Sequence, residues 1–279
     1  MKKYIITIII LFTIISLSIG GYFIYSNAKT NEADSVDKLK EKCLSELNFL
    51  STQTIEIMNG LNNISYSNFE IVNKEIPTSE NGGQNTVSTE NSISSSIVEY
   101  NNILNRNDKD IDWKKISKIV ENIYGSWTNI LIDLTTMNVN KDNLLQYNTI
   151  LDSIVTNIQN KDKVEILTNT ADLYNLLYLY VKDFSDKERE ISLFYIRSNI
   201  LYAYSLASQQ NWDKMREYIN IAKQEFNNVL NNQVDNISNI DVINKAYILI
   251  NEIEDDINNK NESIFYINYK NLMQELEAI

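Results

Sequence analysis

The chain of 279 residues contains no histidine, one cysteine, one proline and only six glycines. Histidine is the side chain that most often acts as a general base at neutral pH, and it is the commonest metal ligand. Its absence excludes serine–histidine and cysteine–histidine catalysis, together with histidine-based zinc, iron and haem sites. The single cysteine, Cys43, cannot form an intramolecular disulfide, so packing has to supply the stability. We predict no catalytic residue, no cofactor and no metal site.

Basic residues are too few for a nucleic-acid-binding protein. The sequence holds 25 Lys and Arg against 37 Asp and Glu, which gives a net charge of −12. A phosphate backbone is bound by clustered Lys and Arg, and no basic stripe occurs along this chain. The composition therefore predicts no nucleic-acid partner.

Only one long apolar run occurs, and it lies at the amino terminus. Residues 4–25 carry no charge and follow Lys2 and Lys3, and about 20 apolar residues suffice to cross a bilayer. We expect residues 1–28 to form a single-pass membrane anchor, with a cytoplasmic amino terminus and an extracytoplasmic body. A second interpretation remains open, because Ser26, Asn27 and Ala28 form a small-x-small site. Cleavage after Ala28 would give a secreted protein.

The next segment, residues 29–76, is predicted to be a long amphipathic helix. Its apolar stripe recurs every three or four residues, at Val36, Leu39, Cys43, Leu47, Leu50, Thr54, Met58 and Leu61. We expect Cys43 to be a buried thiol within this stripe. Residues 77–107 contain the only proline, Pro77, and a run of Ser, Thr and Asn, so they are predicted to be a flexible linker.

Residues 108–279 repeat one pattern, in which helical segments without interior proline alternate with short polar joints. The joints fall at 138–143, 159–163, 183–188, 209–214, 236–241 and 258–262. Short joints place neighbouring helices antiparallel. The sequence therefore predicts an all-α body of six or seven helices, either an antiparallel bundle or a short α-solenoid. The segment 171–184 is apolar nearly all round and is expected in the middle of it.

The acidic group at the start of this body has the spacing of a calcium-binding loop. Asp108, Asp110 and Asp112 occupy positions one, three and five of such a loop. Position six is Trp113, where a sharp turn requires glycine, and position twelve is Ile119, where a bidentate Glu is required. We therefore predict that this acidic group caps a helix.

One pair of helices resembles a repeat family. Residues 199–226 set Tyr202, Ala203 and Leu206 before a turn at Asn211, Trp212 and Asp213, and Met215, Ile219 and Ala222 after it. This spacing is similar to a tetratricopeptide hairpin, although shifting by 34 residues does not reproduce it. The resemblance implies an interaction surface, with Tyr202, Trp212 and Tyr218 as candidate residues. Trp212 adjoins a helix joint, which favours packing against a neighbour over exposure to a partner.

Over most of its length the chain resembles membrane-anchored helical proteins of low-GC Gram-positive bacteria such as clostridia, which have no assigned activity. The phrases "ISYSNFEIVNKEI", "DIDWKK", "YGSWTNILIDL" and "FYINYKNLMQELEAI" carry this resemblance. It implies a location and no reaction. We therefore expect a membrane-tethered extracytoplasmic module that binds a protein or cell-wall partner. The alternative is a carboxylate-dependent enzyme or accessory factor of cell-wall processing.

Overall fold

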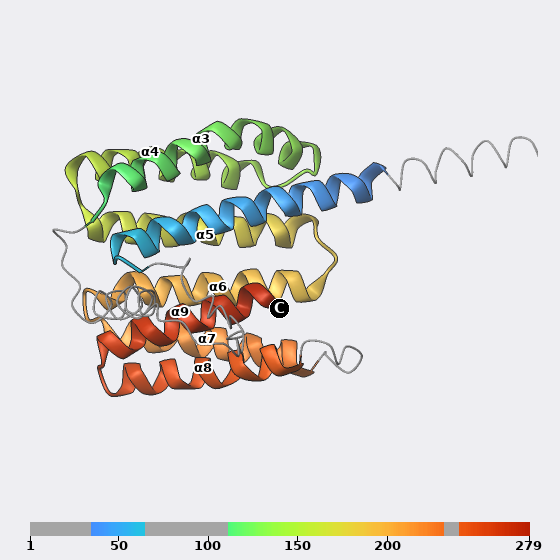
Figure 1. Ribbon diagram of the computed structural model, residues 1–279. Coiled ribbons are helices and arrows are strands. Elements are labelled where there is room, and N and C mark those ends of the chain that lie inside the picture. The colour runs from blue at the N-terminus through green and yellow to red at the C-terminus, as the bar shows by residue number, and fades with distance from the viewer. Residues whose placement is uncertain (1–34, 65–110, 232–239) are drawn as a thin grey trace, which may run out of the picture. The chain divides into compact units, whose positions relative to one another are not determined.

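The computed structural model describes residues 35–64, 111–231 and 240–279 (Figure 1). All regular structure in these ranges is α-helical, so the predicted all-α class is confirmed. The expected anchor (1–28) and linker (77–107) lie outside the described residues. Within the described ranges, the helices are not apolar over enough of their length for any of them to span a bilayer.

One helix covers residues 35–61, and seven more follow in the ranges that can be described. They are α3 (Trp113–Thr136), α4 (Lys141–Asn160), α5 (Lys163–Phe184), α6 (Glu188–Ala207), α7 (Trp212–Asn231), α8 (Ile240–Asn258) and α9 (Glu262–Ala278). The predicted joints at 138–143, 159–163, 183–188, 209–214 and 258–262 coincide with the observed ones to within a few residues, and most of the joint at 236–241 lies outside the described residues. The chain divides into two compact units, residues 1–46 and 47–279, and the arrangement described next is that of the second unit.

Each helix from α4 to α9 packs on the one that precedes it in the chain, and α6 also contacts α9. The α6–α9 contact closes α6, α7, α8 and α9 into a ring (Figure 1). A closed ring of four antiparallel helices is a bundle, whereas a solenoid stacks its repeats along one direction. Of the two predicted arrangements, the bundle is therefore the one observed.

A second group of helices forms around the segment 47–61. At Gly60 an added Cβ would lie 3.4 Å from the Ile116 side chain of α3, so this side chain packs directly over the Gly60 backbone. On the same segment, Ser51 donates a hydrogen bond to the Tyr174 hydroxyl of α5 over 3.0 Å. Because α3, α4 and α5 already pack in sequence, the segment 47–61 brings α3 and α5 together through a shared core.

Tyrosines fill much of this core. Six of them are fully buried, namely Tyr147, Tyr174, Tyr180, Tyr204, Tyr266 and Tyr269. Trp127 stacks on Tyr147 with the ring centroids 3.9 Å apart and so joins α3 to α4. Tyr180 of α5 donates to the carbonyl of Asn143 over 2.8 Å. These rings bury large apolar areas, and the hydroxyls of Tyr174, Tyr180 and Tyr204 have hydrogen-bond partners inside the fold.

Cys43 and most of the predicted stripe are buried. Cys43, Leu47, Leu50, Thr54, Met58 and Leu61 are all inaccessible to solvent, as the periodicity predicts. The two residues at its start are the exceptions, since 42% of Val36 is exposed and Leu39 is only half-buried. The helix also ends earlier than the predicted 29–76 segment, because the chain turns at Asn62 and Asn63.

The acidic group before α3 acts as a helix cap, as predicted. The carboxylate of Asp112 accepts a hydrogen bond from the backbone N–H of Lys115 over 2.9 Å. Asp108 and Asp110 lie outside the described residues. Asn140, Asp162 and Asn261 cap α4, α5 and α9 in the same way. Such caps satisfy backbone donors that have no partner inside the helix.

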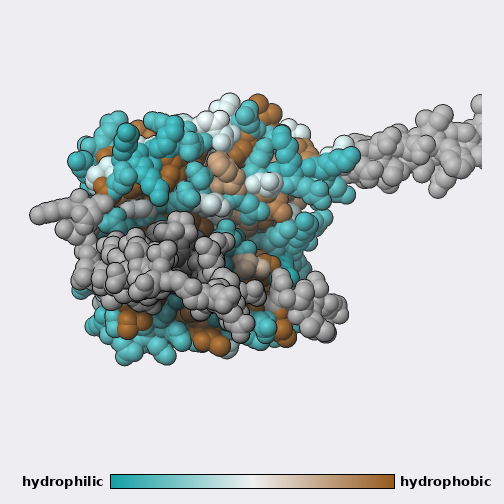
Figure 2. Space-filling model, in the orientation of Figure 1, coloured by the Kyte–Doolittle hydropathy of each residue, from teal (hydrophilic) through white to brown (hydrophobic). Residues whose placement is uncertain are grey.

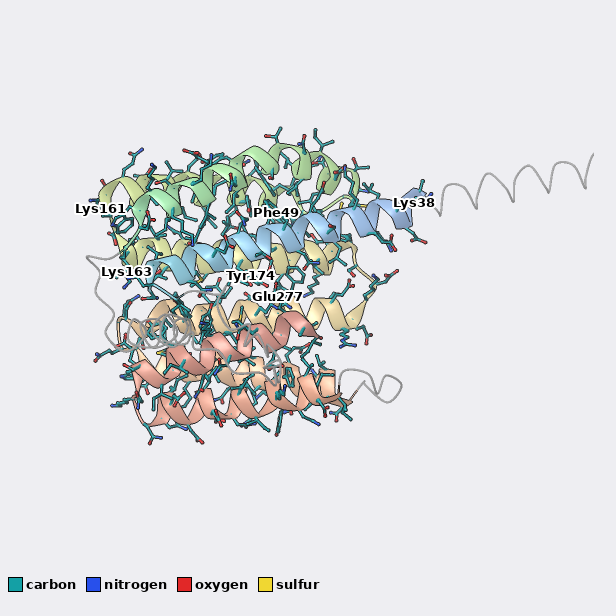
Figure 3. All side chains as sticks on the ribbon, in the orientation of Figure 1. Lys38, Phe49, Lys161, Lys163, Tyr174 and Glu277 are labelled. Carbon is teal, nitrogen blue, oxygen red and sulfur yellow. The ribbon has the colours of Figure 1, made fainter. Side chains whose placement is uncertain are left out.

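Several helices end with the same backbone conformation. Five of the described helices end on a residue in the left-handed conformation, and none of the five is glycine: Asn63, Asn138, Lys161, Gln210 and Lys260. At Gln210 the N–H bonds to the Ala207 carbonyl, and the next N–H bonds to the Leu206 carbonyl, which together form a Schellman motif. The same pair of bonds occurs at the other four ends; Figure 3 marks the α4–α5 joint by Lys161 and Lys163. A side chain in this conformation is strained by about 1 to 2 kcal/mol relative to glycine.

The left-handed joints make a prediction about stability. Gln210→Gly should stabilise the protein by about 0.5 to 1 kcal/mol, because relief of the strain exceeds the added freedom of the unfolded chain. Gln224→Gly is the matched control, since Gln224 is an exposed residue inside α7. That change should destabilise by about 0.8 to 1 kcal/mol. Urea unfolding of both variants measures the difference, and destabilisation by Gln210→Gly would contradict the assigned backbone conformation.

Candidate functional site

Half-buried tyrosines lie along one side of three consecutive helices, α5, α6 and α7. Tyr202 of α6 stacks on Tyr218 of α7 with ring centroids 4.9 Å apart and an angle of 16° between the planes. Tyr178 of α5 stacks on Tyr195 of α6 with the centroids 4.6 Å apart. All four rings are partly accessible to solvent. We call these four residues, with Asp172 and Asn175, the tyrosine face.

Antiparallel packing of α5 against α6 explains why these side chains meet. Asp172 pairs with Tyr202, Asn175 with Ser198 and Tyr178 with Tyr195, so residue numbers rise on one helix as they fall on the other. On each helix the residues recur at about three to four positions, which places them on one side. The tyrosine face is therefore a consequence of helical register and runs along the bundle.

Hydrogen bonds hold the face in one conformation. The Tyr202 hydroxyl donates to the Asp172 carboxylate over 2.9 Å, and Ser198 donates to the Asn175 side chain over 3.1 Å. Each ring of the Tyr202–Tyr218 pair packs on the other, and the hydroxyl of Tyr202 is tied to a neighbouring helix. These contacts hold the rings in place, and such preorganisation reduces the entropy that a surface loses on binding.

Burial governs the ionisation of these groups. It raises the pKa of Asp172, and the hydrogen bond from Tyr202 partly opposes that rise. It also raises the pKa of Tyr202 and of Tyr218, with the Asp172 carboxylate adding to the shift at both. Both phenols are thus protonated at neutral pH and can donate hydrogen bonds. The face offers aromatic surface and hydroxyl donors, as protein interfaces do.

Two of the three candidates from the sequence meet on this face, and the third lies elsewhere. Tyr202 and Tyr218 form the stacked pair. Trp212, the first residue of α7, is only 9% exposed and belongs to the core. This burial is the arrangement that its position beside a joint favours.

Sequence reasoning missed Tyr178, Tyr195 and Asp172. Tyr178 and Asp172 belong to the segment 171–184, which was expected in the middle of the body because it is apolar nearly all round. Asp172 and Asn175 lie one turn apart there, and a carboxylate and an amide on one side of a nearly apolar helix were the available signal.

Among the coloured residues on the side visible in Figure 2, hydrophobic ones are scattered among hydrophilic ones. The most exposed aliphatic side chains are Leu145 and Ile132, on α4 and α3. Scattered exposed aliphatic residues are normal for a protein surface. The tyrosine face differs from them, because it combines two stacked aromatic pairs with a hydrogen bond from Tyr202 to a neighbouring helix.

The burial of Trp212 predicts a large effect of its removal. Trp212→Ala should destabilise the protein by about 3 to 5 kcal/mol, because the change deletes a large buried ring and leaves a cavity. Trp113→Ala is the control, since Trp113 also occupies the first position of a helix but is only half-buried. The Trp113→Ala variant should lose clearly less stability than Trp212→Ala. Denaturant unfolding compares the two variants, and an unchanged midpoint for Trp212→Ala would show that the indole does not pack in the core.

The raised pKa of Asp172 predicts a pH-dependent difference. A carboxyl whose pKa is raised by folding contributes stability at low pH, and this contribution is lost as the pH rises through the folded-state value. Asp172→Asn keeps an acceptor for Tyr202 and removes the charge. The variant should gain stability relative to the parent as the pH rises from about 3.5 to 7, since the ordinary Asp value is near 3.9.

Urea midpoints measured across that pH range test this expectation. Glu217→Gln is the control for the loss of one negative charge, because Glu217 is an exposed carboxylate on α7. An Asp172→Asn variant that loses stability relative to the parent as the pH rises would show that Asp172 favours its charged form in the fold.

Comparison with known proteins supplies no template for this face. No family model, curated protein or solved structure matches the chain. The tyrosine face is therefore a candidate site on the contacts, the burial and the ionisation of its own residues alone.

Proposed function

We propose that this chain is a membrane-tethered, extracytoplasmic module that binds a protein partner through the tyrosine face. The observation that carries the proposal is the stacked Tyr202–Tyr218 pair, which the hydrogen bond to Asp172 holds in place. Interfaces are enriched in tyrosine because its ring buries a large area with few rotatable bonds. A rigid, half-exposed tyrosine pair is therefore suited to anchor a partner.

The charge of the chain indicates the chemistry of that partner. A net charge of −12 disfavours an acidic partner and attracts a basic one at long range. The face itself holds the Asp172 carboxylate, with Lys182 of α5 5.9 Å from the centre of the Tyr178 ring. We therefore propose that the partner is a protein with a basic surface. Capture of a cell-wall polymer in its place would contradict this choice.

The tether rests on the uncharged run at residues 4–25 after Lys2 and Lys3. A run of that length can span a bilayer, and the lysines favour a cytoplasmic amino terminus. On this proposal the body reaches its partner outside the cell while remaining fixed to the surface.

The alternative function predicted from the sequence is a carboxylate-dependent enzyme, and the tyrosine face does not favour it. Its one carboxylate accepts the hydrogen bond from Tyr202. A glycosidase-type site needs two carboxyl groups placed on either side of a bond. The single carboxylate at Asp172 therefore supports the proposal of a binding surface over that of an enzyme.

A crosslinking capture from intact cells tests the proposal with the full-length chain. Tyr218→Ala and Tyr195→Ala should each reduce the recovered partner by about tenfold or more, because a central aromatic anchor contributes at least 1.4 kcal/mol. Tyr247→Ala is the matched control, since Tyr247 is a partly exposed tyrosine of α8 outside the face, and it should capture as the parent does. External protease should remove the body from the same cells and leave the amino terminus.

Three results would contradict the proposal. They are undiminished capture by both face variants, recovery of wall polymer without protein, and recovery in the medium of a chain beginning at Lys29. The last result would show cleavage after Ala28 and would remove the tether.

A further inference from the structure

A separate pocket lies between the segment 47–61, α6 and α9. Its volume is about 420 Å³, which lies within the usual range of small-molecule sites. The residues that line it are Asn48, Ser51, Thr52, Ile55, Glu56, Arg197, Met273 and Glu277. Three elements far apart in the sequence thus build one cavity, and none of its residues belongs to the tyrosine face.

Arg197 supplies the only positive charge among these residues. Its guanidinium donates to the backbone carbonyl of Leu276, in the last turn of α9, and lies beside the Tyr174 hydroxyl. Among the described residues, no carboxylate forms an ion pair with it. A guanidinium carries five N–H donors, so these contacts leave donors for a ligand. A carboxylate is the group that such a planar donor set binds best.

The wall beside Arg197 is polar and rigid. Ser51 is almost fully buried and hydrogen-bonds to Tyr174, which is wholly buried. Figure 3 labels Tyr174 on α5 and Glu277 on the last turn of α9, the two elements that flank Arg197. Burial raises the pKa of Tyr174, so this hydroxyl is neutral at physiological pH. The guanidinium is therefore the dominant charge in the interior of the pocket.

The opening carries the opposite charge. Glu56 and Glu277 are both solvent-exposed and come from different elements. Two carboxylates at the mouth repel a ligand with more than one negative charge and attract an ammonium group. Their exposure also distinguishes these two carboxylates from catalytic general acids, whose side chains lie in apolar surroundings.

These charges point to one class of ligand. We propose that the pocket binds a small zwitterion of the α-amino-acid type, with its carboxylate on Arg197 and its ammonium group toward Glu56 and Glu277. Ile55 and Met273 supply apolar surface for an aliphatic side chain. This site is independent of the protein-binding face and goes beyond the proposed function.

Calorimetric titration of the full-length protein with three probes tests the site. Leucine carries both charges, 4-methylpentanoate lacks the ammonium group, and 3-methylbutylamine lacks the carboxylate. Leucine should bind at least about tenfold more tightly than either analogue, a difference of about 1.4 kcal/mol. Failure of leucine to bind at millimolar concentration, or equal binding of all three probes, would overturn the proposal.

Two variants locate the binding while leaving the fold intact. Glu56→Gln removes an exposed rim charge and should weaken leucine binding about tenfold while sparing 4-methylpentanoate. Thr52→Phe places a ring at the exposed rim and should abolish binding. Glu217→Gln, on α7 and away from the pocket, should bind leucine as the parent does. Unchanged leucine affinity in both pocket variants, with unfolding midpoints equal to the parent, would place the ligand elsewhere and defeat the proposal.

Discussion

The buried hydroxyl of Tyr204 joins the parts of the described fold that are farthest apart in the sequence. It accepts a hydrogen bond from the Asn62 side chain over 2.7 Å and donates to the Met58 carbonyl over 3.0 Å. Its ring packs on Tyr266 and Tyr269 of α9, with centroids 5.1 and 4.3 Å away. One residue of α6 thus fixes the end of the segment 47–61 and the last helix together. A buried hydroxyl without partners is costly, so only an arrangement that supplies both bonds is stable.

The same helix explains how two surfaces of different chemistry coexist. Tyr195 and Tyr202 lie on the side of α6 that meets α5 and α7, whereas Arg197 turns toward α9. Arg189 and Arg197 both donate to backbone carbonyls at the end of α9. These carbonyls have no partner within the helix, and cations near a helix carboxyl end are favourable. The arginines therefore stabilise the closure of the bundle, and one of them also charges the pocket.

How much the sequence predicts depends on the range of the interaction. Helix positions follow from local pattern, and the joint at 159–163 contains Lys161, where α4 ends. The left-handed conformation of Lys161 could not be foreseen, because glycine is the usual signal for it. The burial of Tyr204 could not be predicted either, since its hydrogen-bond partner Asn62 is 142 residues away in the sequence. Tyr202 and Tyr218 could be found because they share one hairpin, whereas Tyr178 and Asp172 reach them only through packing between helices. The pocket depends on three distant elements and leaves no local signature.

The position of α6 between the face and the pocket has an energetic consequence. Tyr202 of the face and Arg197 of the pocket both belong to α6, so a shift of this one helix would move both of them. Thermodynamic linkage then requires reciprocity: the factor by which a zwitterion alters partner binding equals the factor by which the partner alters zwitterion binding. On the two proposals above, the concentration of a small zwitterion would therefore set how strongly the tyrosine face holds its partner.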